Sequence, residues 1–155
     1  MIKIYLFNYN ADTDTDDLIR RVIPGARIVR EKGKKPRLES PIGVHFSLSH
    51  SYDLCAVAVA ERPVGVDIEK VREVKGAERI AKKYYSPAER ETDFLQVWVR
   101  KESRVKRDGT GMAAISPECA STGSDIIELD LPKGYVGALC CDGAADGNIQ
   151  VHRMR

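Results

Sequence analysis

The sequence predicts an α+β fold, in which a mostly antiparallel sheet carries one long helix on one of its sides. Segments rich in β-branched and aromatic residues occur near both ends of the chain and in its middle, which is typical of strands. Apolar residues recur at helical spacing between the middle and the final strands, which predicts the long helix. The chain has 155 residues, enough for one compact domain or for two small lobes that share a core.

The first part of the chain is expected to form strands and one short helix. Acidic residues at 12–17 supply N-cap candidates for that helix, and Pro24-Gly25 stops it. The expected elements are a strand over residues 2–7, a helix over 18–23, a short strand over 26–30, a turn over 45–51 and an apolar strand over 54–60.

The later elements follow from similar local signals. Residues 61–63 are few enough to turn the chain from the apolar strand straight into the next one, which predicts a hairpin. Ser86, Pro87 and Glu89 form a strong helix start. The expected elements are a strand over 64–69, a helix over 71–85, the long helix from 86 to about 107 with a glycine-containing exit at 108–111, and strands over 126–131, 135–141 and 149–152.

Two carboxylates share one face of the strand over 64–69. Side chains alternate along a strand, so Asp67 and Glu69 point to the same side as Gly65, which has no side chain. A solvent-exposed strand face is one interpretation of this pattern. A site for a hard cation is the other, because Mg²⁺ prefers oxygen ligands such as carboxylates.

A third carboxylate, Glu102, lies within the apolar face of the long helix. That face is formed by Phe94, Leu95, Trp98 and Val105. A carboxylate among core side chains needs a cation or several donors, because an isolated buried charge is costly. Lys106 follows one turn later, and an ordinary Glu–Lys pair on a helix surface is the simpler interpretation. Together with the strand pair, however, Glu102 predicts a magnesium site.

Four motifs in this order resemble the signatures of the 4′-phosphopantetheinyl transferases, and in particular their two-lobed, surfactin-synthetase-activating branch. They are Lys35-Pro36, Phe46-Ser47-Leu48-Ser49-His50-Ser51, Gly65-Val66-Asp67-Ile68-Glu69, and Trp98-Val99-Arg100-Lys101-Glu102-Ser103-Arg104-Val105-Lys106 followed by Gly109-Thr110-Gly111. The resemblance runs from about residue 34 to residue 111. It is weaker to the small trimeric holo-acyl-carrier-protein synthases, whose carboxylate strand begins the chain.

This resemblance implies an enzyme that moves the 4′-phosphopantetheinyl group of coenzyme A onto a serine of a carrier protein. It implies Mg²⁺, or Mn²⁺ in its place, held by Asp67, Glu69 and Glu102. Glu102 would also take the serine proton, and Lys106 would place a cation beside the phosphates.

The resemblance also implies contacts to coenzyme A outside the carboxylate motifs. They would come from Lys35, Pro36, Ser49 and His50, together with Lys106. Judged by the residues alone, the basic run over 30–37 is a solvated loop and His50 is a structural residue. Both interpretations stay open at this stage.

Two lobes related by an approximate twofold axis are a further implication. Residues 1–62 would form a shortened N-terminal lobe with the coenzyme A motifs, and residues 63–155 a C-terminal lobe with the metal-binding and catalytic motifs. The carrier protein, from fatty acid, polyketide or nonribosomal peptide synthesis, would dock on the basic helix over 71–85, unless that helix is an ordinary charged surface. Two lobes in one chain favour a monomer.

Two other functions fit parts of the sequence. A two-metal nuclease of the ribonuclease H type also has an aspartate on a Gly-Val-Asp strand, but that strand normally opens the domain. A degenerate family member would bind coenzyme A or carrier protein without transfer, and the short N-terminal lobe supports this alternative. The presence of all three carboxylates and Lys106 favours the enzyme.

The composition is that of an ordinary globular protein, with 43% hydrophobic and 31% charged residues. A net charge of +2 is too small to make nucleic acid the expected partner. No apolar run approaches the length of a membrane span and the N-terminus lacks a signal-peptide pattern, so we expect a cytoplasmic protein with no membrane partner. The four cysteines lack metal-site spacing and are expected to be reduced.

Overall fold

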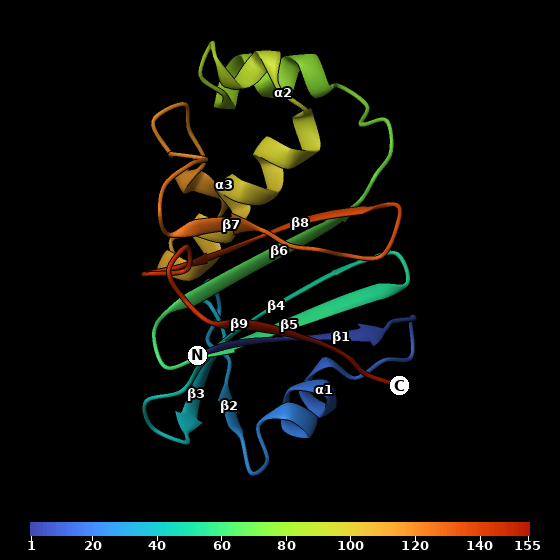
Figure 1. The fold of residues 1–155 in the computed structure, drawn as a ribbon, viewed down its shortest axis with the longest axis vertical. Helices are drawn as coiled ribbons and strands as arrows, with labels where there is room; N and C mark the ends of the chain where they lie inside the picture. Colours follow the sequence, from blue (N-terminus) through green and yellow to red (C-terminus); the bar gives the residue numbers. More distant parts are fainter.

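The computed structural model describes residues 1–155 and contains two sheets, a small ribbon and three α-helices (Figure 1). The first sheet has the strand order β4-β5-β1-β9 and the second has the order β6-β8-β7, while β2 and β3 form the ribbon. The elements are β1 (Ile2–Asn8), α1 (Thr15–Val22), β2 (Arg27–Val29), β3 (Arg37–Ser40), β4 (His45–Ser51), β5 (Leu54–Ala60), β6 (Val64–Lys70), α2 (Ala77–Tyr84), the 3₁₀ turn η1 (Glu89–Glu91), α3 (Phe94–Asp108), the 3₁₀ turn η2 (Met112–Ala114), β7 (Ile126–Glu128), β8 (Tyr135–Cys141) and β9 (Ile149–Arg153). This arrangement confirms the predicted α+β class.

The main core lies between the two sheets. Alternate residues of β1 and β5, among them Ile4 and Ala58, pack against Val66 and Ile68 of β6 and Leu139 of β8. The small alanines of β5 add little side-chain volume between the two sheets. The predicted alternation along β6 is therefore confirmed: its apolar side faces the core, and its other side is left for Gly65 and the carboxylates.

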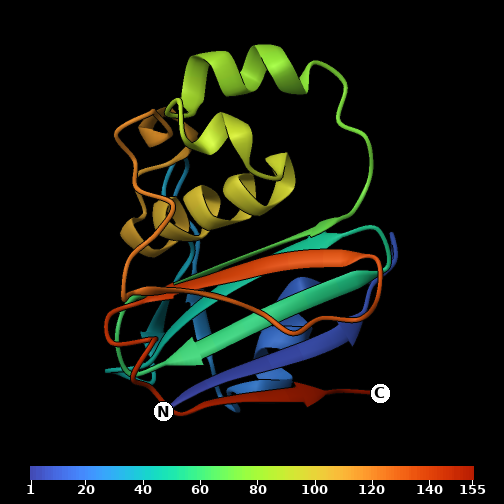
Figure 2. The same ribbon diagram turned by 45° about the horizontal axis from the view of Figure 1, so that its top comes forward.

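Each sheet is covered by a helix on its outer side. Leu18 of α1 packs with Phe7, Cys55 and Val57 on the first sheet. α3 lies across the second sheet, and α2 sits beyond α3 at the far end of the molecule (Figure 2). None of these helices is long and apolar enough to cross a membrane.

The last strand returns to the first sheet. β9 pairs in parallel with β1, with Ile4 opposite Val151 (Figure 1). The two-lobe division at residues 62 and 63 stays a prediction, but the structure adds that residues 149–153 extend the sheet formed by the N-terminal half.

Two predictions about the middle strands are wrong. Residues 45–51, expected as a turn, form the strand β4, which pairs antiparallel with β5. The expected hairpin between β5 and β6 is absent, because β1 and β4 occupy both edges of β5. β6 pairs instead with β8, with Asp67 opposite Ala138.

The helical region is more broken than predicted. The helix expected over 71–85 is limited to α2, which begins after Gly76 at φ +77°. Ser86 and Glu89 do form a reciprocal capping box, but it closes the turn that leads into η1 and starts no α-helix. Thr92 is extended, and α3 starts afresh with Asp93 as N-cap, whose side chain accepts from the Gln96 N–H at 3.0 Å. The predicted end of the long helix is confirmed, since Gly109 caps it at φ +71°.

Candidate functional site

The site depends on an unusually close approach between α3 and β6. A Cβ placed on Gly65 would overlap the carbonyl oxygen of Ser103 and the amide nitrogen of Arg107. Only glycine fits here, so the helix backbone rests directly on the strand. The approach brings Glu102 and Lys106 of α3 next to the carboxylates that follow Gly65 on β6.

Asp67 is buried at the centre of this contact, with 5% of the residue exposed. Its Oδ1 accepts hydrogen bonds from Lys106 Nζ at 2.9 Å and from the Ser49 hydroxyl at 3.1 Å. Its Oδ2 is buried without any hydrogen-bond partner. Burial raises the pKa of Asp67 to about 6, although the charge of Lys106 acts in the opposite direction. Asp67 thus retains an unused acceptor that would suit a further cation.

Glu102 is also buried, with 7% of the residue exposed. Its carboxylate forms no ion pair or hydrogen bond with another residue, so the simple pairing with Lys106 is not what the structure shows. Burial raises the pKa of Glu102 to about 7, and the nearby negative charge of Asp67 contributes in the same direction. A buried carboxyl with a pKa near neutrality can exchange a proton at physiological pH.

Glu69 is held at the rim of the same region. Its Oε2 accepts from Arg72 Nη1 at 2.9 Å and from the Ser51 hydroxyl at 3.4 Å. Asp67, Glu69, Glu102 and Lys106 all line one cavity of about 340 Å³. The structure therefore brings together all the residues predicted for metal binding and catalysis.

The cavity fits a hard cation in its chemistry. Its acidic residues supply oxygen ligands, Asp67 Oδ2 lacks a partner, and two carboxyl groups have raised pKa values. As the side chains stand, no three acidic, histidine or cysteine residues form a closed ligand set. Lys106 and Arg72 each occupy one carboxylate oxygen.

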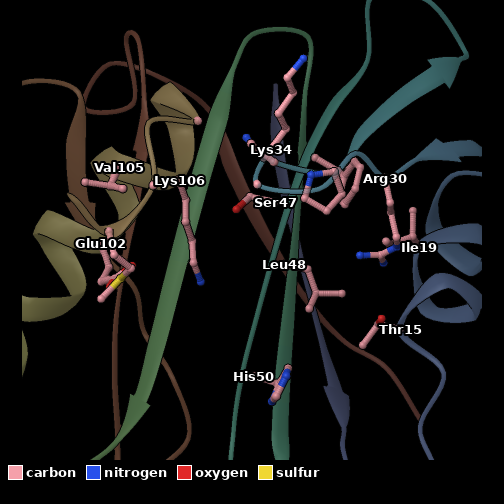
Figure 3. A pocket seen from close by; sticks show the side chains of 17 residues that line it. Thr15, Ile19, Arg30, Lys34, Ser47, Leu48, His50, Glu102, Val105 and Lys106 are labelled. Atoms are coloured by element: carbon pink, nitrogen blue, oxygen red, sulfur yellow. The ribbon is translucent and has the colours of Figure 1, made fainter. Parts of the chain in front are cut away.

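A larger cavity of about 520 Å³ adjoins the first and shares His50, Glu102 and Lys106 with it. Figure 3 shows Glu102 and Lys106 of α3 on one side, Thr15 and Arg30 from the N-terminal half on the other, and His50 of β4 between them. Basic residues are prominent in its lining: Arg30, Lys34, Lys35, His50 and Lys106. Such a surface suits an anionic ligand with a phosphate group.

Lys35 and Pro36, the residues predicted to contact a ligand, line this larger cavity. The Lys35 ammonium, however, donates to the carbonyl oxygen of Val64 at 2.7 Å. Burial lowers the pKa of Lys35 to about 8, and the positive charge of Lys106 is the second largest cause of this lowering. Lys35 therefore ties the basic loop to the start of β6, in addition to any role toward a ligand.

Ser49 and His50 are neighbours in the chain but lie in two different environments. His50 is exposed, lines both cavities, and stacks on Tyr9 with ring centroids 4.2 Å apart. Ser49 is buried, and its hydroxyl is engaged with Asp67 and with the N–H of Ile68. His50 is exposed to a ligand although its Nε2 lies 3.4 Å from the Tyr9 hydroxyl, whereas Ser49 holds the carboxylate strand.

Sequence reasoning missed two supports of the site. Tyr9, under His50, lies in an irregular segment with no motif to mark it. Lys101 is fully buried and donates to the carbonyl oxygens of Ser116 and Cys119, both at 2.7 Å, and pairs with Glu89 at 2.9 Å. The position of Lys101 beside Glu102, on a helix with a partly apolar face, was the sequence signal that could have indicated its burial. These contacts fix the segment after α3, whose start lines the larger cavity.

Comparison with known proteins agrees with this geometry. Residues 63–142 match the family model described as the 4′-phosphopantetheinyl transferase superfamily. The matched range contains β6, α3 and β8, and therefore Asp67, Glu69, Glu102 and Lys106.

Curated relatives carry the same description. A 4′-phosphopantetheinyl transferase of Bacillus subtilis is 33% identical over 122 residues, covering 69% of this chain and 52% of the relative. The Bacillus pumilus transferase psf-1 is 36% identical over 54% of this chain and 40% of its own length. The HetI transferase of Nostoc sp. is 32% identical over 56% of this chain and 42% of its own length.

The chain spans about half the length of the curated relatives it matches. The family model nevertheless covers more than half of the chain, including the whole carboxylate cavity apart from its β4 wall. This chain belongs to the 4′-phosphopantetheinyl transferase superfamily.

Proposed function

We propose that this protein transfers the 4′-phosphopantetheinyl group of coenzyme A to a serine of a carrier protein, with Mg²⁺, and releases 3′,5′-bisphosphoadenosine. The observation that carries the proposal is the meeting of Asp67, Glu69, Glu102 and Lys106 at one cavity that opens beside a larger basic one. The family supports the reaction class.

The larger cavity is the proposed coenzyme A site. Arg30 and Lys34, with Lys35 and Pro36, would lie at its nucleotide end, and His50 and Lys106 near the diphosphate. Because His50 and Lys106 line both cavities, a diphosphate beside them would lie next to the carboxylates. Such an arrangement would position the phosphorus for attack without requiring a covalent intermediate on the protein.

Asp67, Glu69 and Glu102 are the proposed ligands of Mg²⁺, or of Mn²⁺ in its place. A bound divalent cation would neutralise charge on the diphosphate as the leaving group departs. The buried Asp67 Oδ2 is the ligand atom with the clearest need for a cation, since it has no partner within the protein.

Glu102 is the proposed acceptor of the serine proton, directly or through a water molecule. Its raised pKa makes it a stronger base than an exposed glutamate. The serine oxygen then bonds to the phosphorus of the pantetheine phosphate while the bond to the bisphosphoadenosine oxygen breaks. Lys106 would stabilise the negative charge on the phosphate oxygens, and Asp67 holds its ammonium in place at 2.9 Å.

The carrier protein is proposed to dock on α2 and the segment before it. The basic side chains here are Arg72, Lys75, Arg79, Lys82 and Lys83. A groove of about 600 Å³ lies between this segment and the start of α3, and its lining mixes apolar residues such as Val71, Val74 and Phe94 with charged ones, including Glu73 and Asp93. An acidic partner with a few apolar anchors fits such a surface. We propose carriers of fatty acid, polyketide or nonribosomal peptide synthesis as substrates, acted on by a cytoplasmic monomer.

A second candidate function is binding of coenzyme A or carrier protein without transfer. The observation favouring it is that Lys106 and Arg72 already pair with carboxylate oxygens of Asp67 and Glu69, which a bound cation would need.

Intact-mass measurement of apo carrier proteins separates the two candidates. Carriers are incubated with this protein, coenzyme A and Mg²⁺, with and without a chelator. A gain of one phosphopantetheinyl mass that disappears with the chelator supports transfer. Binding of coenzyme A with no mass gain on any carrier supports the binding module instead.

A further inference from the structure

The two sheets meet along β4 and β6, and this contact is called the seam. Along it, serine side chains of β4 bond to the backbone of β6, in place of a ladder of main-chain hydrogen bonds. The three serines alternate along β4, so they point to the same side of the strand. Each hydroxyl oxygen accepts a hydrogen bond from a peptide N–H of β6, at N···O distances of 3.0, 3.1 and 3.0 Å. The pairs of this serine ladder are Ser47 with Val66, Ser49 with Ile68, and Ser51 with Lys70.

Two hydroxyls of the serine ladder make a second hydrogen bond, this time to a carboxylate. Ser49 donates to Asp67 Oδ1 at 3.1 Å, and Ser51 donates to Glu69 Oε2 at 3.4 Å. A hydroxyl can do both at once because it has one hydrogen to donate and two lone pairs to accept with. Ser47 contacts no carboxylate. The ladder therefore holds the β6 backbone at three points and orients carboxylates at two of them.

The orienting contact matters most for Glu69. Its side chain is 21% exposed, compared with 7% for Asp67, and it has one more rotatable bond. Arg72, near the end of β6, binds the same Oε2 atom at 2.9 Å. Without the Ser51 hydroxyl, Arg72 would be the remaining side-chain partner of Glu69, and the carboxylate would be free to follow it away from the cavity.

We propose that Ser51 is a positioning residue that keeps Glu69 directed at the cation. This inference rests on the proposed function only in assigning a divalent cation to the carboxylate cavity. Hydrogen bonds of this kind, one step removed from the ion, commonly change metal affinity by about 10-fold or more when they are lost. Ser47 is the matched control, because it holds β6 by the same hydrogen bond but touches no carboxylate.

The test is direct binding of Mn²⁺, measured from the electron paramagnetic resonance signal of the free ion, without coenzyme A or carrier protein. We expect Ser51→Ala to weaken Mn²⁺ binding about 10-fold. Ser47→Ala is expected to lower the melting temperature similarly while leaving the affinity within about 2-fold of the wild type. Ser51→Thr, which keeps the hydroxyl, should restore most of the affinity. If Ser51→Ala does not fold, Ser51→Cys serves in its place with the same expected loss.

A double-mutant cycle with Glu69→Gln tests whether Ser51 acts through Glu69. We expect the effect of Ser51→Ala on Mn²⁺ affinity to be nearly absent in the Glu69→Gln background. Equal Mn²⁺ affinities for Ser51→Ala and Ser47→Ala would overturn the inference, as would an undiminished effect in the Glu69→Gln background. Because binding is measured without transfer, the positioning role can fail while the transferase assay succeeds, and the reverse can also occur.

Discussion

Two aspartates contact cationic side chains of α3, and their environments are opposite. Asp125 receives both terminal nitrogens of Arg104, at 2.7 and 3.0 Å, and Arg107 at 2.6 Å. These hydrogen bonds lower the pKa of Asp125 to about 2, and those from Arg104 have the largest influence. Asp67 receives one lysine and one hydroxyl, leaves Oδ2 without a partner, and has its pKa raised to about 6 by burial.

The difference separates a structural ion cluster from the proposed reactive site. Around Asp125 the donors match the acceptors, so the cluster ties the C-terminal end of α3 to the segment before β7 and needs no further ligand. Around Asp67 the negative charge exceeds the available donors, because Glu102 adds a second buried carboxylate with no partner. The fold leaves carboxylate oxygens without donors around Asp67 but supplies donors for those of Asp125. A local shortage of donors of this kind indicates a functional site at Asp67.

The largest expected effect is on transfer by Glu102→Gln. The substitution keeps the shape of the side chain and removes the proposed base, so we expect the transfer rate to fall on the order of 10²–10³-fold. Glu118→Gln, at an exposed position on the segment after α3, is the control and should retain the wild-type rate. Carrier modification followed by intact mass gives both rates. A Glu102→Gln rate close to that of Glu118→Gln would remove Glu102 from the proposed mechanism.

The next expected effect concerns Gly65→Ala, which tests how the site is assembled. The added methyl group would overlap the backbone of α3 at Ser103 and Arg107, so helix and strand must separate. We expect a loss of about 1–3 kcal/mol in the free energy of unfolding, together with loss of transfer. Urea unfolding measures the first and intact mass the second. Gly43→Ala gives a contrast without overlap, since a Cβ there meets nothing within 4 Å and any cost comes from the φ of +80° alone. Normal stability and rate in Gly65→Ala would show that the close approach is not required.

Asp125→Asn and Asp67→Asn should affect stability in different ways. Asp125→Asn weakens charge-assisted hydrogen bonds to two arginines and is expected to cost about 1–3 kcal/mol. Asp67→Asn removes a buried charge that is only partly compensated, so the free energy of unfolding at pH 7 should stay the same or rise. Urea unfolding of both variants measures the difference. A larger loss for Asp67→Asn than for Asp125→Asn would reverse the interpretation of the two regions.

The same pair predicts opposite dependences on pH. The depressed pKa of Asp125 means that its stabilising effect is present above its ordinary value near 4 and is lost as the pH falls toward about 2. The raised pKa of Asp67 means that the folded state holds the proton more tightly, so stability falls as the pH rises from about 4 to about 6. Unfolding of the wild type and both variants between pH 3 and 7 tests this. We expect the deficit of Asp125→Asn to shrink toward pH 3, and the wild type to lose stability relative to Asp67→Asn toward pH 7.

The smallest expected effect is the response of stability to Mg²⁺. A cation bound by the carboxylates stabilises only the folded protein, so saturating Mg²⁺ should raise the melting temperature of the wild type by a few degrees. Asp67→Asn should lose this response, whereas Asp125→Asn should keep it from a lower starting point. An equal response in all three proteins would place the bound ion elsewhere.

Local patterns were sufficient to predict the parts of the site that lie on one element. Alternation along β6 put Asp67 and Glu69 together, and helical spacing put Glu102 on the buried side of α3, because both depend only on the geometry of one strand or one helix. The cap at Gly109 was predictable for the same reason.

The features of the fold and of the site that the sequence did not predict depend on contacts between distant segments. The prediction of a hairpin between β5 and β6 was wrong because β1, which lies more than forty residues earlier in the chain, pairs with one edge of β5. The turn expected over 45–51 is a strand because its main chain pairs antiparallel with β5, and its serines in addition accept from N–H groups on β6. The engagement of Lys35 with the Val64 carbonyl has no local signal, and the helix alone does not identify the segment after α3 that accepts from Lys101.

The most direct test of the contrast is the initial rate of carrier modification by Asp67→Asn and Asp125→Asn, compared at a temperature where both are folded. We predict that Asp67→Asn loses transfer on the order of 10²-fold or more while remaining as stable as the wild type. Asp125→Asn should transfer at close to the wild-type rate despite its lower stability. Full activity in Asp67→Asn with loss of activity in Asp125→Asn would contradict the assignment of the reactive site to the seam between β4, β6 and α3.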